Sequence, residues 1–416
     1  MDSAKDFILE FKKHGWRMTK QDPYATVTNL IATKSPLIFD VAAVALRELD
    51  ELPIFVVDLL DHLEEDQLAK LAELALEAVP ASDAQLSILS AAAYQVPSAL
   101  GQQLARLYDL VEDYDYRLTP AWRAADATEV KRLERLLDQD DPTRPLMCLF
   151  ETPDTDVFDS VVGRHPAIES SLIQSLASHS AIHIDYDHAT PLMVGPCHHL
   201  HFEYNPDTYN QEVQLDRAKV GRREDLHPTL NLTSDHDFVR AFGGALEDTC
   251  GICGGELHKL MDLSRLPAAF RIRTPQLVLA TCLSCLSWEQ DVLSYEHDDS
   301  GLPHTLDGDG EVREPQFPAE PLAETVVRVS PTPSRWQEQQ MDGRQNFNRL
   351  GGRPTWIQDP EYPNCVKCDS VMPFVAQFDS LLATRSGYEW LWGSGGVCYF
   401  FWCDNCRVSA SRLQCT

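Results

Sequence analysis

Cys250-Gly-Ile-Cys253 is the first of four C-x₂-C knuckles that decide how the C-terminal half of this chain folds. The others are Cys282-Leu-Ser-Cys285, Cys365-Val-Lys-Cys368 and Cys403-Asp-Asn-Cys406. Two residues between the cysteines of a knuckle let both sulfurs reach one ion at about 2.3 Å, and a second knuckle completes a tetrahedron. The spacing therefore predicts two structural zinc sites of the zinc-ribbon kind, one from the first two knuckles and one from the last two. Because four thiolates leave no position for water, we expect these ions to stabilise the fold and not to catalyse.

Length and composition indicate a globular protein. The 416 residues suffice for two or three domains, and the apolar runs are too short to span a bilayer. The N-terminus, Met1-Asp-Ser-Ala-Lys-Asp, lacks the pattern of a secretory signal. Eight of the 12 cysteines fall in the knuckles, which favours a reducing compartment over a disulfide-bonded, secreted protein. We expect a cytoplasmic protein without a membrane partner.

The net charge of −29 bears on the choice of partner. An acidic surface repels nucleic acid, and the basic cluster Arg217–Arg223 is short and flanked by acids. Excess acid can also steer a basic protein into contact. These features favour a protein partner over nucleic acid, and the charge suggests a basic one. An acidic surface that is merely solvated is the alternative, and the sequence specifies no oligomeric state.

The region 1–145 is predicted to be helical. Its apolar residues recur at helical spacing, as in Val41, Val44, Ala45 and Leu49. Ser82 with Gln85 predicts a capping box. Short alanine-rich helices suggest an antiparallel, HEAT-like stack that offers a surface to other proteins. A bundle that only supports the next domain is the alternative.

From about 145 the pattern changes to that of strands, and the fold class predicted for the whole chain is α+β. Ala181–His188 alternates apolar and polar residues, and Val397–Trp402 is a β-rich run that leads into Cys403. We predict a mainly antiparallel β module with the first four-cysteine site over 146–295 and a second such module over 346–416. The segment 296–345, rich in Pro, Asp, Glu and Gly, is predicted to be a linker or an excursion.

The two cysteine regions read as an internal duplication. Phe242-Gly-Gly and Leu350-Gly-Gly each precede a knuckle, an apolar strand that closes in Asp and Ser, and a second knuckle. The copies differ in detail, since Leu260-Met-Asp262 stands in the first where Gln377-Phe-Asp379 stands in the second. A binding site common to both copies is therefore not expected.

The second copy resembles a known family through Leu350-Gly-Gly-Arg-Pro-Thr-Trp356, Phe374-Val-Ala-Gln-Phe-Asp379 and Gly395-Gly-Val-Cys-Tyr-Phe-Phe-Trp402. These segments are similar to the YwqG-like family of uncharacterised bacterial proteins, a subset of which carries cysteine knuckles beside the same strands. The Gly-Gly turn and the knuckles also resemble the programmed-cell-death-2-like zinc proteins, some of which protect a ribosomal protein. The resemblance covers about 350–410, and more weakly 240–290. It implies no reaction, but it suggests a toxin-immunity or client-protecting protein that binds other proteins.

A histidine-rich segment over 179–201 supports the rival hypothesis, a metal-dependent hydrolase. His183 and Asp185 share one strand face and His199 and His201 share another, so that together they could form a site of nitrogen and oxygen ligands. Surface histidines on alternating strands explain the run more simply. No established catalytic motif is present, and we predict no catalytic residues. The tryptophans of the second copy could pack in its core or form a binding surface; Trp402 is expected in the core.

Overall fold

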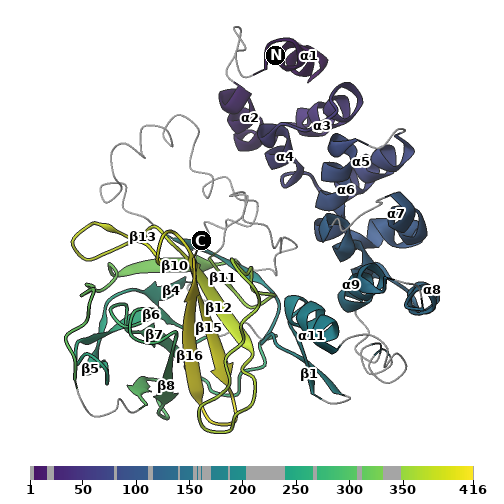
Figure 1. The fold of residues 1–416 in the computed structure, drawn as a ribbon. Helices are drawn as coiled ribbons and strands as arrows, with labels where there is room; N and C mark the ends of the chain where they lie inside the picture. Colours follow the sequence, from purple (N-terminus) through teal and green to yellow (C-terminus); the bar gives the residue numbers. More distant parts are fainter. Residues whose placement is uncertain are drawn as a thin grey trace. The chain divides into compact units, whose positions relative to one another are not determined.

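The computed structural model describes residues 4–15, 23–78, 82–110, 116–138, 141–152, 157, 161, 170–185, 188–202, 239–265, 269–306, 312–330 and 348–415. They fall into two compact units (Figure 1): helices through residue 180 form a helical unit, and residues from 190 onward form most of a β unit. The predicted α+β class is confirmed. Of the helices in this described part, none combines the length and the hydrophobicity that crossing a bilayer requires.

The helical unit is a succession of short helices that pack mainly on close neighbours in the chain. They are α1 (Ala4–His14), α2 (Pro23–Ala32), α3 (Leu37–Glu48), α4 (Ile54–Leu60), α5 (Glu65–Glu77), α6 (Asp83–Gln95), η2 (Pro97–Gln103), α7 (Leu104–Leu110), η3 (Tyr116–Ala124), α8 (Ala127–Leu136), α9 (Thr143–Glu151) and α11 (Ser170–His179), where η denotes a 3₁₀ helix.

The capping box predicted at the start of α6 is confirmed. The Gln85 N–H donates to Ser82 Oγ at 3.2 Å, and the Ser82 N–H donates to Gln85 Oε1 at 3.3 Å. The buried Gln85 side chain also donates from Nε2 to the Ala75 carbonyl at 2.6 Å. One side chain therefore fixes the start of α6 and ties it to the end of α5.

The helical region extends beyond the boundary predicted at 145. Helix α9 buries Leu146, Leu149 and Phe150, which lie at i, i+3 and i+4, and α11 follows it. Pro145 lies in the first turn of α9, where a helix needs no N–H donor from it. The first strand begins only at Ile182.

The β unit is built on one large sheet, and every paired strand in it is antiparallel. Its spatial order is β5-β6-β4-β10-β3-β11-β12-β15-β16-β8-β9, with β7 also paired to β6. These strands are β3 (His198–Phe202), β4 (Val239–Phe242), β5 (Ala245–Thr249), β6 (Glu256–Asp262), β7 (Val278–Thr281), β8 (Val292–His297), β9 (Pro303–Thr305), β10 (Thr325–Val329), β11 (Arg349–Leu350), β12 (Phe374–Asp379), β15 (Val397–Cys403) and β16 (Val408–Gln414). Two small sheets pair β1 (Ile182–Asp185) with β2 (His188–Pro191) and β13 (Leu382–Ala383) with β14 (Glu389–Trp390).

The large sheet curls so that β7 approaches strands from the opposite end of the spatial order. The Val278 N–H donates to the Gly301 carbonyl at 3.0 Å. The hydroxyls of Thr281 and Ser411 are hydrogen-bonded at 2.7 Å. Apolar side chains from both cysteine-bearing halves, among them Trp402, pack into one core. The expectation that Trp402 belongs to the core is confirmed.

The cysteine-bearing halves are therefore not the two consecutive modules that the sequence predicts. Strand β8 follows the first pair of knuckles, yet it pairs with β16, which follows the second pair. The segment 296–345 is not simply a linker, because β10 lies in the middle of the sheet between β3 and β4. Val327 and Val329 lie two residues apart on one face of β10 and are buried, whereas Val326 and Arg328 on the other face are half-buried. The buried face holds β10 in the sheet.

The Gly-Gly turns of the duplication have a steric cause. All four glycines adopt positive φ, from +61° at Gly351 to +92° at Gly244. A Cβ at Gly243 would lie 2.1 Å from the Ala323 carbonyl oxygen, and a Cβ at Gly351 would lie 2.3 Å from the Pro196 carbonyl oxygen. Only glycine lets the chain pass this close to its neighbour in each copy.

A buried polar network follows the Gly-Gly turn of the second copy. Arg349, which is fully buried, lies opposite Gln377 and donates from Nη2 to Gln377 Oε1 at 3.2 Å and to the Arg353 carbonyl at 2.9 Å. Gln377 Oε1 also accepts the Thr355 N–H at 2.9 Å, and the Tyr399 hydroxyl donates to the Thr355 carbonyl at 2.6 Å. The Gln377 of the family-like motif is thus the acceptor that joins the turn to β12.

The first copy lacks the residue pair at the centre of this network. If the copies are aligned on their Gly-Gly turns and closing aspartates, Ala241 stands in place of Arg349 and Leu260 in place of Gln377. Both members of the polar pair are replaced together by apolar residues in the first copy.

Candidate metal centres

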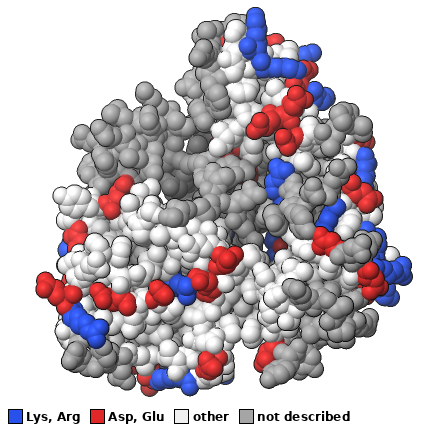
Figure 2. Space-filling view, in the orientation of Figure 1, with Lys and Arg blue, Asp and Glu red and all other residues white. Residues whose placement is uncertain are grey.

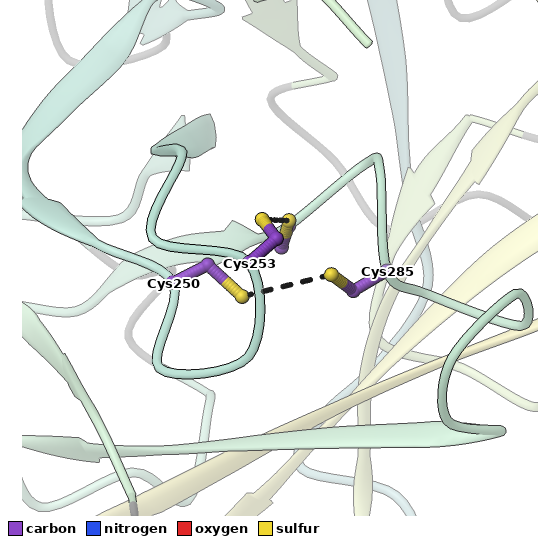
Figure 3. A group of neighbouring side chains, drawn as sticks. Cys250, Cys253 and Cys285 are labelled. Carbon is purple, nitrogen blue, oxygen red and sulfur yellow. Dashed lines mark hydrogen bonds between the residues drawn. The ribbon is translucent and has the colours of Figure 1, made fainter. Parts of the chain in front are cut away.

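The first centre brings together Cys250, Cys253, Cys282 and Cys285, whose sulfur atoms all lie within 4.8 Å of one another. The first knuckle lies between β5 and β6, and the second follows β7, which pairs with β6. The Sγ atoms of Cys250 and Cys285 are 3.8 Å apart, and those of Cys253 and Cys282 are 3.7 Å apart. Figure 3 shows the labelled cysteines converging from the two knuckles.

These distances suit a tetrahedral metal ion. Four sulfurs that each lie about 2.3 Å from one ion are about 3.8 Å from one another. The cluster is also largely buried, with Cys253 the half-buried member. The first group can therefore hold a metal ion in an all-sulfur site that leaves no position for water.

The second centre brings together Cys365, Cys368, Cys403 and Cys406 in the same way. Cys403 ends β15 and Cys406 lies in the turn before β16, and the Sγ atoms of Cys368 and Cys403 are 3.7 Å apart. This centre is more open, because Cys368 is exposed and Cys406 is half-buried. The structure therefore groups all eight predicted ligands into the two sets that the sequence suggests.

The leading knuckles of the two centres share one backbone geometry. The Cys250 N–H donates to the Gly255 carbonyl, and the Cys365 N–H donates to the Ser370 carbonyl, both at 2.9 Å. The residue four positions after each first cysteine, Gly254 or Asp369, donates its N–H back to that cysteine's carbonyl at 2.8 Å and has positive φ. The duplication in sequence is therefore a duplication of the metal-binding turn itself.

Two side chains support the first centre from behind. The Tyr295 hydroxyl accepts the N–H of Cys282 at 2.9 Å, and His258 Nδ1 accepts the N–H of Leu283 at 3.1 Å. Burial lowers the pKa of His258, which keeps its ring neutral and able to accept. Groups that orient ligands in this way tune a metal site. Neither residue is predicted from the sequence, because each lies on a β strand, 13 or 25 residues along the chain from the N–H group that it accepts.

Electrostatics show why four thiolates need a cation. Side-chain hydrogen bonding with Cys282 and Cys285 lowers the pKa of Cys250, whereas hydrogen bonding with Cys250 raises the pKa of Cys282 and of Cys285. In the second centre a hydrogen bond from Ser370 lowers the pKa of Cys368 to about 6, and burial raises the pKa of Cys403. Neighbouring thiols thus oppose complete ionisation, so a bound cation must displace their protons, and its affinity must fall at low pH.

The remaining cysteines lie apart from these clusters. Cys148, Cys197 and Cys398 are buried, and burial raises the pKa of all three thiols, that of Cys197 to about 11. Cys398 lies in the fully buried strand β15. Protonated, buried thiols are poor nucleophiles.

The histidine-rich segment does not form a third cluster within the described residues. Among the described residues, only the two cysteine groups bring three or more candidate metal ligands together. His199 and His201 are buried on β3 with ring centroids 6.3 Å apart, and burial lowers the pKa of His201 to about 4. His183 belongs to the separate β1–β2 sheet. The basic cluster Arg217–Arg223 lies outside the described residues.

Comparison with known proteins gives one curated relative. The chain is 24% identical over 241 residues to the uncharacterised protein YpfL of Salmonella typhimurium strain LT2, an alignment that covers 51% of this chain and 50% of the relative. The chain thus spans about half the length of the relative it matches. No family model and no solved structure matches the chain.

Proposed function

We propose that this chain is a non-enzymatic, cytosolic protein-binding protein whose β unit is stabilised by two structural zinc ions. The observation that carries the proposal is the pair of closed four-cysteine clusters. All-sulfur, tetrahedral surroundings are typical of zinc or of iron–sulfur sites, and ribbon-like knuckles favour zinc. Because all four positions of each ion are taken by sulfur, each centre acts on the fold, and a partner must bind elsewhere on the surface.

The kind of partner follows from charge and from family resemblance. The net charge of −29 suits a basic protein, and the likeness to the YwqG-like family suggests a toxin or another client that this chain neutralises or protects. A row of acidic side chains crosses the described surface of the β unit, at the lower left of Figure 2. It offers a field that would steer a basic partner toward this unit.

Metal analysis of the purified protein tests the structural part. We expect two zinc ions per chain and no visible absorption from iron. Cys250→Ser and Cys365→Ser should each remove one ion, whereas the matched control Cys415→Ser, which changes a half-buried cysteine outside both clusters, should keep two. Removing zinc with a chelator should loosen the β unit in amide hydrogen exchange and leave the helical unit protected. Iron in the clusters, or full protection without metal, would contradict the assignment.

The binding part is tested by native mass spectrometry of the protein purified from its own host. A stoichiometric complex with a basic protein supports the proposal. A chain without any partner, which instead carries a third metal ion lost on His199→Ala, would favour the hydrolase.

A further inference from the structure

The two metal-binding turns face a common cavity in the β unit. The cavity has a volume of about 440 Å³, within the range of ligand sites. Ile252, from inside the first knuckle, and Val366 and Lys367, from inside the leading knuckle of the second centre, contribute to its lining. Strands β8 and β9, with the residue after β9, contribute Val292, Leu293, Ser294, Tyr295, Thr305 and Leu306 to the lining. The shape of the cavity therefore depends on both metal centres.

An exposed aromatic pair lies beside this cavity. Trp288 and Phe317 are 46% and 45% exposed, and their ring centroids are 4.2 Å apart. Trp288 follows Cys285 in the turn that continues to Gln290, which lines the cavity. The segment that carries Phe317 is tied to the first knuckle by the Arg313 N–H, which donates to the Ile252 carbonyl at 2.9 Å. Each aromatic residue is therefore carried by a segment that is joined to a residue of the cavity lining, Gln290 for Trp288 and Ile252 for Phe317.

Three exposed carboxylates accompany the aromatic pair: Glu289, Asp291 and Glu314. Glu289 Oε1 accepts the Gln316 N–H at 3.5 Å, which holds the two segments side by side. In the described part of the chain, none of the three carboxylates forms an ion pair, unlike Glu296, which pairs with Lys367 at 2.5 Å. Aromatic faces and carboxylates both attract cationic side chains.

We propose that this acidic–aromatic face, made of Trp288, Phe317, Glu289, Asp291, Glu314 and the adjoining cavity, binds an extended, arginine- or lysine-rich segment of a partner protein. Its cationic side chains stack on Trp288 and Phe317 among the carboxylates, and an apolar side chain of the same segment enters the cavity. The occupant must be basic, because the local charges and the net charge of −29 both repel an acidic chain. The proposal refines the protein-binding function proposed above and depends on it.

Fluorescence anisotropy with a labelled peptide of alternating arginine and leucine tests the face, with a peptide of alternating glutamate and leucine as the control ligand. The zinc-loaded chain should bind the basic peptide, and more weakly as salt is added. Trp288→Ala or Phe317→Ala should weaken binding about tenfold, the effect of losing one hot-spot aromatic. Glu289→Gln with Glu314→Gln should weaken binding and flatten its salt dependence. Removing zinc should also weaken it, because both knuckles line the cavity.

Matched variants separate this face from charge alone. Tyr388→Ala removes another exposed aromatic, 76% exposed, and Glu73→Gln with Glu77→Gln removes two exposed charges from α5 of the helical unit. Both controls should bind as the unaltered chain does, and all variants should keep two metal ions.

Equal binding by Trp288→Ala, or equal losses in the controls, would overturn the proposed face while leaving a protein-binding function elsewhere on the chain. No preference for the basic peptide over the acidic one would also overturn the face. The metal content and the native mass spectrum test the broader function separately.

Discussion

Replacing Gln377 with leucine should destabilise the β unit more than its size change suggests. Gln377 Oε1 accepts two buried donors, the Thr355 N–H at 2.9 Å and Arg349 Nη2 at 3.2 Å. Arg349 is fully buried, and its Nε and Nη1 atoms have no hydrogen-bond partner among the described residues. Losing Gln377 would leave the Arg353 carbonyl and the Thr355 hydroxyl as the acceptors of Arg349 Nη2.

The expected cost follows from the two donors. A buried neutral N–H without an acceptor costs about 1–3 kcal/mol, and a lost hydrogen bond to a charged group about 1.5–3 kcal/mol. The leucine side chain offsets part of this loss by burying apolar surface. We therefore expect Gln377→Leu to lower the free energy of unfolding of the β unit by about 3 kcal/mol. Adding Arg349→Leu removes the buried charge and should return about 2 kcal/mol of that loss. The first copy supports this direction, since it carries Ala241 and Leu260 at these positions.

Amide hydrogen exchange of β11 and β12 in the zinc-loaded chain measures these free energies in place. Arg349→Leu alone is the matched control, because it removes the charge and leaves the Gln377 acceptor for Thr355. The reasoning predicts that the two substitutions are not additive. If Arg349→Leu deepened the loss caused by Gln377→Leu, the buried guanidinium would be stabilising and the argument would fail.

Two further predictions concern a buried histidine and a helix cap. Burial lowers the pKa of His297 to about 4, so the unfolded chain binds more protons between about pH 6.5 and pH 4, and stability falls as the pH falls through this window. Between about pH 7.5 and pH 5.5, His297 should account for about 1 kcal/mol of the fall in the free energy of unfolding. Urea unfolding at these two pH values should therefore show a smaller fall for His297→Gln than for the unaltered chain. The same fall in both proteins would refute a buried, neutral His297. Ser82→Ala should cost the helical unit about 1 kcal/mol by leaving the Gln85 N–H uncapped, as measured by hydrogen exchange of α6, while Ser82→Asn should be close to neutral.

The sequence determined the features that depend on residues close together in the chain. Two cysteines separated by two residues must present their sulfurs on one turn, so Cys250–Cys253 and its three counterparts could be recognised without any tertiary information. The capping box at Ser82 is local for the same reason. The Gly-Gly turns were recognisable as a repeat, but their need for glycine comes from contacts with Ala323 and Pro196, which are distant in the chain.

Tertiary structure decided how these parts are combined. Backbone hydrogen-bonding groups are the same along every strand, so the sequence of β8 does not reveal that it pairs with β16. Strand β10 was not predicted, because it lies in a segment rich in Pro and acidic residues. The same long-range pairing brings Tyr295 and His258 behind the first metal centre and places both knuckles around one cavity. Residues close together in the chain set the type and spacing of the metal ligands. The cavity beside the two metal centres forms only when the sheet curls and its strands pack around a common core.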